Sequence, residues 1–399
     1  MTAVLDLIAD RDVAAPRRAA PDLAVELHRI GDLDAVEPHW RALFVEAIEP
    51  NPFLGPDFLR PLGRLRAGRI QVALVWRGSG AGRRLAALLP FTVEPGLPLI
   101  RPPLLRGLAD PFVVNATPLV GADGTAAVIE RLLAELSRRF PRAVLVMEPL
   151  RLHGPVAAGI AAAGRPTLLA RSHERAAIRA GLPSGAYLEA RVPGKRVREL
   201  RRCEKRLSEA GTVETRTLWG PAAAPAVNAF LAIEAAGWKG RQGTALASKP
   251  AVLAFAREAL SGTAPMAAAD LMRVDGKPIA AALHLVAGDE AVAFKCAYDE
   301  TWSRASPGAL LDVHTLLMTL DGGQVSLMDS GALPGHPVEG LWRERVAFGR
   351  LLVDLRRDST PAALERVSAR LDRIDGLVSE VKARLRRALG RKATALRSA

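Results

Sequence analysis

Cysteine is scarce in this chain, and the two cysteines present lie in unrelated patterns. Among 399 residues only Cys203 and Cys296 occur. Cys203 falls in a charged helical pattern and Cys296 in an apolar strand pattern, so neither a disulfide framework nor a cysteine zinc site is predicted. The seven histidines include no pair at HxxxH spacing, and no bound metal is expected.

Long apolar runs and targeting features are also missing. The longest uncharged run, residues 217–233, contains one glycine and two prolines, whereas a transmembrane helix needs about 20 predominantly apolar residues. The N-terminus carries three aspartates among its first twelve residues and no basic segment followed by an apolar one, so no secretory signal is predicted. These absences favour a cytoplasmic protein.

Positive charge is in excess, but it is concentrated in two segments. The net charge is +13; residues 193–209 hold seven lysines and arginines against three glutamates, and residues 359–399 hold ten against four acidic residues. Neither segment contains an aromatic residue, and stacking on aromatics is typical of proteins that bind single-stranded nucleic acid. We therefore predict no specific nucleic-acid partner.

The length and composition suit two globular domains, since 49% of the residues are apolar and 24% are charged. We predict a loose lead-in at 1–22, an N-terminal domain at 23–180, a C-terminal domain at 181–356 and a basic tail at 357–399.

Hydrophobic periodicity predicts the same order of elements in both domains: strand, two helices, antiparallel strands, helix, strand. In the first domain Asp32 is predicted to cap the first helix. The elements expected there are strand 23–29, helices 33–48 and 57–66, strands 70–76 and 84–93, helix 126–140 and strand 143–147. Those expected in the second are strand 213–219, helices 222–236 and 250–260, strands 267–274, 279–286 and 291–297, helix 307–320 and strand 325–329.

The tail has a heptad pattern. Its apolar residues alternate spacings of three and four, which predicts an amphipathic helix over 361–392. A helix of this kind either docks on its own protein, associates with a second copy, or lies on an anionic membrane surface. The residues of the stripe are Leu364, Val367, Leu371, Ile374, Val378, Val381, Leu385 and Ala388.

Three features of the second domain resemble a known family: the basic helix 195–209, the segment 234–245 and the step Ser306-Pro307-Gly308. They resemble the GNAT-superfamily domain of cellulose-biosynthesis-associated acetyltransferase-like proteins, which are relatives of the Fem peptidyltransferases. The resemblance implies a mixed α/β (α+β) fold of two tandem GNAT-like domains with a C-terminal helix. It also implies acyl transfer from acetyl-CoA or another acyl-CoA to an amine or hydroxyl.

In that family the donor's pyrophosphate meets a helix N-terminus, where free N–H groups and the helix dipole favour anions. Ser306 is predicted to be the N-cap of the corresponding helix, and Gly308 would let a phosphate approach the backbone. The usual signature Gln/Arg-x-x-Gly-x-Gly/Ala has serine at two positions here, and Pro307 removes one amide, so an ordinary capped helix is the alternative. The candidate donor-binding residues are Arg304, Ser306, Gly308 and Ala309.

Acyl transfer also needs a route for protons and a place for the acceptor. Glu234 and Asp329 are the candidate bases and Tyr298 the candidate acid; surface charges and a rim aromatic are the alternatives. A lysine in a strand as apolar as that around Lys295 should need a carboxylate partner or a ligand. The loop 237–245 supplies an aromatic and a cation. The candidate acceptor-binding residues are Trp238, Lys239, Thr244, Lys295, Asp299, Arg201 and Arg202.

The leading hypothesis is an acyl-CoA-dependent transferase that acts on a saccharide or cell-envelope precursor, with the acceptor class implied by the resemblance. A Fem-like transferase that uses aminoacyl-tRNA is the alternative within the same fold. A non-catalytic scaffold that acts through its helical tail, by self-association or peripheral membrane contact through 361–392, is the alternative from another class.

Overall fold

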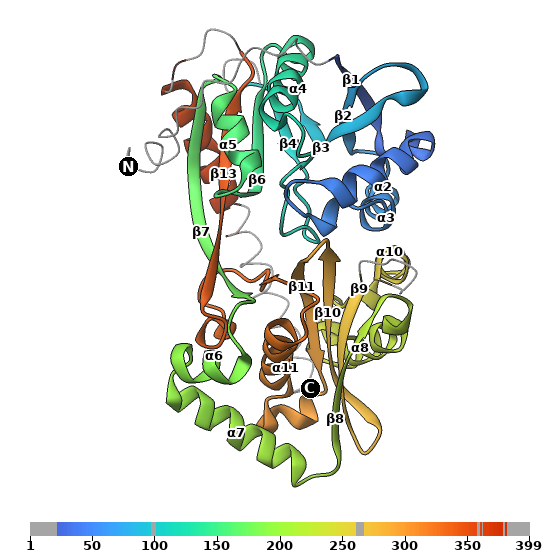
Figure 1. The fold of residues 1–399 in the computed structure, drawn as a ribbon, viewed down its shortest axis with the longest axis vertical. Helices are drawn as coiled ribbons and strands as arrows, with labels where there is room; N and C mark the ends of the chain where they lie inside the picture. The colour runs from blue at the N-terminus through green and yellow to red at the C-terminus, as the bar shows by residue number, and fades with distance from the viewer. Residues whose placement is uncertain are drawn as a thin grey trace, which may run out of the picture.

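The computed structural model describes residues 22–96, 101–260, 267–356, 360, 362–377 and 380. They form two α/β halves that lie one above the other in Figure 1 and are joined by two long strands, β7 and β13. The predicted lead-in lies outside the described residues, apart from Asp22.

The helices and strands between residues 23 and 162 form most of the first half. Its strands are β1 Leu23–Arg29, β2 Gln71–Arg77, β3 Arg84–Glu94, β4 Leu104–Gly107, β5 Leu119–Val120 and β6 Val144–Arg151. Its helices are α2 Glu37–Glu46, α3 Pro56–Leu65, α4 Thr125–Arg139 and α5 Pro155–Ala162.

The second half follows with β7 Thr167–Arg179, β8 Val213–Trp219, β9 Ala267–Val274, β10 Lys277–Ala287, β11 Glu290–Tyr298, β12 Leu327–Asp329 and β13 Glu344–Asp354. Its helices are α6 Ser184–Arg191, α7 Gly194–Ser208, α8 Ala224–Ala236, α9 Trp238–Arg241, α10 Pro250–Leu260 and α11 Pro307–Asp321. Short 3-10 helices in the two halves are η1 Ile30–Asp32, η2 Asp34–Val36, η3 Pro52–Leu54, η4 Gly80–Gly82, η5 Gly220–Ala223, η6 Leu246–Ser248, η7 Glu300–Ala305 and η8 Pro337–Gly340.

All strands belong to one mixed sheet, in the order β1-β2-β3-β4-β6-β13-β7-β12-β11-β10-β9-β8, with β5 beside β3. Its neighbours are antiparallel except for one parallel pair in each half. Residues 104–106 of β4 lie beside 144–146 of β6, and residues 290–292 of β11 lie beside 327–329 of β12. The predicted mixed α/β fold with a repeated element order is therefore confirmed.

The last strand of the chain returns to the first half. β13 pairs with β6 on one side and with β7 on the other, while the end of β7 pairs with β12 of the second half. The two halves therefore share strands, and the predicted division at residues 180 and 181 stays a prediction.

A common apolar core joins the halves on one face of the sheet. Helices α8 and α10 cover this face in the second half, and α3 of the first half packs against α10 (Figure 1). The rings of Phe58 and Phe255 lie edge to face, 5.5 Å apart. Both side chains are buried, and each full burial stabilises the fold by roughly 1.5–3 kcal/mol.

The first helix starts later than predicted. Asp32 does not cap it: the chain passes through η1 and η2, and α2 begins at Glu37 with Val36 at the N-cap position. Pro38 explains the difference, because proline lacks an N–H and fits only in the first turn of a helix.

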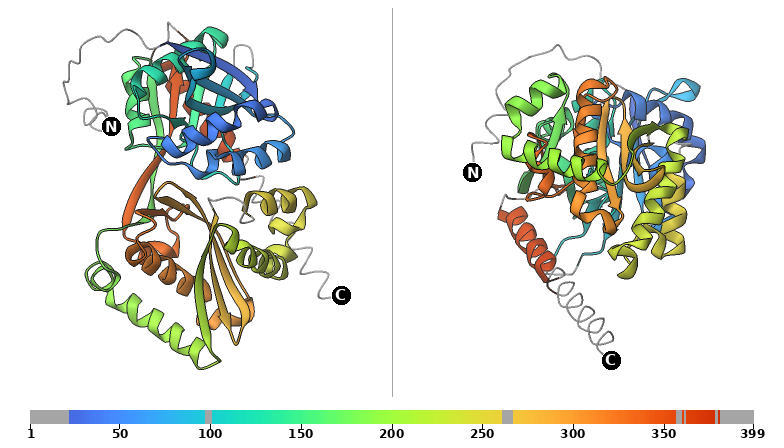
Figure 2. Two further views of the ribbon diagram at one scale, coloured as in Figure 1. Left: turned by 45° about the vertical axis from the view of Figure 1, so that its right-hand side comes forward. Right: turned by 90° about the horizontal axis from the view of Figure 1, so that it is seen from below.

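The start of the tail docks on its own chain. Residues 362–377 are helical, and Leu364, Val367 and Leu371 are buried against residues of β4, β6 and β13. The Asp372 carboxylate lies 3.0 Å from the Arg350 guanidinium of β13. In Figures 1 and 2 this helix lies against the first half.

Beyond that contact Ile374 of the stripe is exposed, as is the neighbouring Leu377, which is not part of the stripe. Val378, Val381, Leu385 and Ala388 lie outside the described residues, so self-association and membrane contact stay predictions. Among the helices of the described ranges, none is long and apolar enough to cross a membrane.

Candidate active site

The parallel strands β11 and β12 separate after three residue pairs. β11 continues to Tyr298, whereas the chain leaves the sheet after Asp329. Gly331 makes this departure possible: its φ is +61°, and a Cβ there would lie 2.8 Å from the carbonyl oxygen of Ala293. The separation leaves a cavity of about 360 Å³ beside the free edge of β11, which we call the wedge cavity.

The wedge cavity reaches both faces of β11. Lys239, Phe294 and Lys295 line it on the side of α8 and α9, while His284 and Asp312 line it on the side of α11. A β-bulge lies in this wall, because Lys295 is opposite Leu283 but Ala293 is opposite His284. Phe294 is thus the extra residue, and a bulge of this kind re-aims side chains and interrupts the ladder of backbone hydrogen bonds.

A buried carboxylate organises the α11 side of the cavity. Asp270 on β9 accepts hydrogen bonds from Thr217 (2.7 Å), His284 Nε2 (2.9 Å) and Thr315 (2.7 Å). Burial alone would raise the pKa of Asp270, but His284, His314 and Thr217 outweigh it and hold that pKa below its usual value. The carboxylate is therefore ionised and fixes the orientation of the His284 ring.

The second nitrogen of that ring is not engaged in the same way. Since Nε2 donates to Asp270, Nδ1 is left as an acceptor. His284 Nδ1 is buried and has no hydrogen-bond partner within the described ranges. An imidazole that is oriented by a carboxylate and has one acceptor nitrogen left over can take a proton from a reacting group.

Asp312 on α11 is a second titratable group of the same wall. Burial raises its pKa to about 6, and Asp270 adds to this, although Arg196 and His284 act in the opposite direction. A carboxyl group with a pKa close to neutral is suited to proton transfer.

The predicted bases occupy engaged positions. Glu234 is buried; its Oε1 lies 2.9 Å from Lys239 Nζ and its Oε2 accepts the Leu246 N–H at 2.8 Å. Asp329 accepts the Gly331 N–H at 2.9 Å and lies 3.4 Å from the Arg175 guanidinium. Burial raises the pKa of Asp329 in spite of that arginine. Both carboxylates hold loops in place, and their catalytic roles stay predictions.

The predicted acid and the donor-binding residues come together at the N-terminus of α11. Tyr298 is 40% exposed, and a Cβ on Gly308 would lie 3.6 Å from its ring. Ser306 occupies the N-cap position as predicted, but its side chain makes no capping bond and its backbone is left-handed, with φ +49°. The expected side-chain cap is therefore wrong. Arg304 is exposed, and its carbonyl accepts a hydrogen bond from Arg206 of α7; Ala309 packs against the core beneath α11.

The predicted acceptor-binding residues lie in several places, and two of them, Lys239 and Lys295, line the wedge cavity. Trp238, Lys239 and Thr244 belong to the loop around α9, where Trp238 is 52% exposed and the Thr244 hydroxyl donates to the Lys239 carbonyl. Asp299 accepts from the N–H and hydroxyl of Thr301 and so caps η7. The exposed Arg201 and Arg202 lie on α7, away from the wedge cavity, and Arg201 lines a separate groove of about 970 Å³ between α7 and α11.

Sequence reasoning missed Asp270, His284 and Asp312. A signal for two of them existed, because Asp270 and His284 interrupt otherwise apolar strands, and a buried polar group needs a partner. Their pairing depends on the register of β9 and β10, which the sequence pattern alone does not provide.

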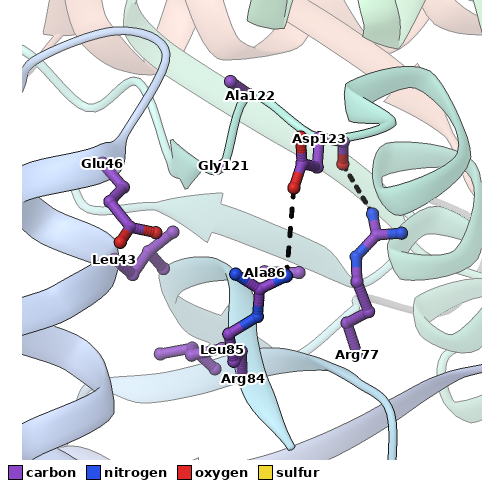
Figure 3. Close-up of a pocket in the computed structure, with 9 residues that line it drawn as sticks. All are labelled: Leu43, Glu46, Arg77, Arg84, Leu85, Ala86, Gly121, Ala122 and Asp123. Atoms are coloured by element: carbon purple, nitrogen blue, oxygen red, sulfur yellow. Dashed lines mark hydrogen bonds and ion pairs between the residues drawn. The ribbon is translucent and has the colours of Figure 1, made fainter.

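The first half has a hollow of its own, shown in Figure 3. It measures about 250 Å³ and lies between α2, β3 and the segment 121–123. Figure 3 shows Arg77 and Arg84 both directed at Asp123; Arg77 donates to its carbonyl at 2.5 Å and Arg84 lies 4.0 Å from its carboxylate. These charges compensate each other, and the hollow offers no oriented base comparable to His284.

Part of the second half matches a family of known proteins. Residues 194–336, from the start of α7 to the segment after β12, match the family described as an acetyltransferase (GNAT) domain. Residues 194–336 of the second half are thus similar to a GNAT acetyltransferase domain. The match contains β11, β12, α11 and His284, and the chain is accordingly an acyltransferase.

Among solved structures, FemX supports the fold. FemX superimposes with a TM-score of 0.51 at 9% identity, covering 83% of this chain and 98% of FemX. L-PGS from Bacillus licheniformis (TM-score 0.46, 13% identity, 84% and 96% coverage) and a tandem GNAT protein from the clavulanic acid biosynthesis pathway (0.38, 14%, 85% and 100%) are also similar. At such identities the FemX likeness shows the fold alone. No curated protein sequence matches the chain significantly.

Proposed function

We propose that this protein transfers an acyl group, acetyl in the simplest case, from coenzyme A to an amine or hydroxyl in the wedge cavity. The observation that carries the proposal is the Asp270–His284 pair in the cavity wall, with an acceptor nitrogen left over on the imidazole.

The donor would enter from the N-terminus of α11. The N-terminus of this 15-residue helix carries free N–H groups and the positive end of the helix dipole. Gly308 presents no side chain to a pyrophosphate, and the left-handed backbone of Ser306 turns the chain sharply into the helix. The thioester would then reach the free edge of β11 beside the bulge.

The chemistry follows from these positions. The acceptor nitrogen or oxygen attacks the thioester carbonyl carbon, and His284 Nδ1 takes the proton that the acceptor loses. The carbon–sulfur bond breaks, and the thiolate of coenzyme A leaves with a proton from Tyr298, which solvent restores. Asp270 stabilises the imidazolium that forms, and Asp312 is the alternative proton acceptor in the same wall.

The proton has a way out of the cavity wall. Thr217 Oγ1 lies 2.7 Å from Asp270 and 2.9 Å from His314 Nε2, and His314 lines the groove between α7 and α11. Deprotonation of His284 between turnovers would use this hydrogen-bonded route.

For the acceptor we propose a saccharide or cell-envelope precursor, as in the cellulose-biosynthesis-associated relatives that the second half resembles. We place the protein in the cytoplasm, with the basic tail available for contact with the inner membrane face. The alternative donor is aminoacyl-tRNA, and the experiment below tests it as well.

Calorimetric titration with acetyl-CoA, coenzyme A and uncharged tRNA tests the proposal. We expect acetyl-CoA to bind and to raise the melting temperature with the logarithm of its concentration. Binding of tRNA without binding of either coenzyme A species at millimolar concentration would replace the proposal by the alternative.

A further inference from the structure

Two lysines line the wedge cavity on the side of α8 and α9, and one of them has no carboxylate. Lys239 is paired with Glu234 at 2.9 Å, and the other oxygen of Glu234 is occupied by the Leu246 N–H. Lys295 makes no hydrogen bond or ion pair with any residue that the structure describes. Asp312, the remaining carboxylate of the cavity, belongs to the opposite wall.

The surroundings of Lys295 only partly replace water. Its Nζ lies 5.2 Å from the ring centre of Phe294 and 5.6 Å from that of Phe112, which comes from the first half. Aromatic faces attract a cation, but they do not satisfy the three N–H donors of an ammonium group. Burial lowers the pKa of Lys295, and the neighbouring charge of Lys239 lowers it further.

A partly buried cation without a carboxylate partner is stabilised when a ligand supplies the opposite charge. A metal cation is excluded as that ligand by the sign of the charge. A carboxylate or phosphate fits, since either oxyanion accepts several N–H bonds and charge-assisted bonds of this kind are strong.

We infer that the acceptor of this acyltransferase carries an anionic group, a carboxylate or a phosphate, which pairs with Lys295 at the junction of the two halves. The inference rests on the proposed function and narrows its substrate class. The anionic end of the acceptor stays on the side of α9, and its amine or hydroxyl reaches round the free edge of β11 toward the thioester and His284. The Trp238 loop borders this path.

Matched probes test the inference. Glucosamine and glucosamine 6-phosphate differ by one phosphate, and ethylamine and β-alanine differ by one carboxylate, so the two pairs distinguish the two anions. With acetyl-CoA as donor, thiol release gives kcat/KM for each. We expect the wild type to prefer the anionic member of at least one pair by roughly 10- to 100-fold, the range of a charge-assisted hydrogen bond.

Three variants assign that preference to one side chain. Lys295→Met should bring the preference close to one, and Lys295→Arg should retain most of it because the charge is kept. Lys249→Met, at an exposed lysine before α10, is the matched control and should behave as wild type. Acetyl-CoA affinity, measured for each variant, shows that the donor site is intact.

A binding measurement distinguishes failure of this inference from failure of the proposed function. Glucosamine 6-phosphate or β-alanine should raise the melting temperature of the wild type more than its neutral counterpart does, and Lys295→Met should remove the difference. Equal behaviour of charged and neutral probes in both turnover and melting would overturn the inference while leaving acetyl-CoA binding in place. Failure of acetyl-CoA to bind, with the melting difference retained, would instead count against the proposed function alone.

Discussion

The two halves of this protein share an order of elements but differ at the point where their parallel strands separate. In the first half β4 ends at Gly107, and the chain itself fills the space beside β6. The Ala116 N–H bonds to the Pro149 carbonyl at 2.8 Å, and Asn51 donates to the Asn115 and Thr117 carbonyls. In the second half the corresponding space is the wedge cavity.

The comparison shows that the same order of elements can leave this separation either filled or open, and the proposed chemistry uses the open one. The filling segment of the first half also serves the second. Phe112 faces Lys295, and the Val114 carbonyl accepts a bond from Arg175 at 2.5 Å. The filled segment of the first half thus contacts side chains of the second half.

The largest effect is expected from removal of the base in the second half. His284→Gln keeps a donor for Asp270 but cannot take up a proton near neutral pH. We expect kcat with acetyl-CoA to fall about 10²- to 10⁴-fold, while the KM for acetyl-CoA changes little. His28→Gln, on β1 of the first half, is the control, and an equal loss there would contradict the assignment of chemistry to the second half.

Closing the wedge cavity should make the second half resemble the first. Ala332 lines the cavity, and Ala332→Phe would occupy the space that the donor needs. We expect kcat/KM for acetyl-CoA to drop at least about 10-fold, since a misplaced substrate loses much of its rate. Circular dichroism should be unchanged; retention of full activity would show that the thioester lies elsewhere.

Breaking the buried ion pair between β7 and β12 should act on stability. Asp329→Ala leaves Arg175, itself 3% exposed, without its carboxylate. Removing one partner of a buried ion pair costs about 3–5 kcal/mol, which urea denaturation measures. A loss of activity without a loss of stability would instead support Asp329 as the base.

The smallest effect concerns Asp312 and depends on pH. The pKa of Asp312 is about 6 in the folded protein, whereas its ordinary value is 3.8. The folded state therefore binds more protons than the unfolded state between these values, and the free energy of unfolding decreases as pH rises from about 4 to 6. Asp312→Asn should therefore stabilise the protein by about 1–3 kcal/mol above pH 6 and have no effect below pH 4. A stability difference between Asp312→Asn and wild type that stays constant across this pH range, measured by thermal unfolding, would contradict the burial of the Asp312 charge.

The sequence predicts regular elements well where their pattern is local. Strands β8 and β9 and helix α10 have the predicted bounds. Strands β7 and β13 were missed because the partners of their polar residues are distant in sequence. Arg350, in the middle of β13, contacts Asp372 of the tail. The pairing of Asp270 with His284 likewise arises from strand register, and the register is a property of the assembled sheet.

The position of β13 has a consequence for how the protein is made. Residues 344–354 form the strand between β6 and β7, so the chain must be synthesised through residue 354 before the sheet of the first half can close. Until then β6 has a bare edge that other chains can pair with. A fragment cut at the interdomain position would keep that edge permanently, and a peptide of residues 344–354 added in trans is the piece that would cover it.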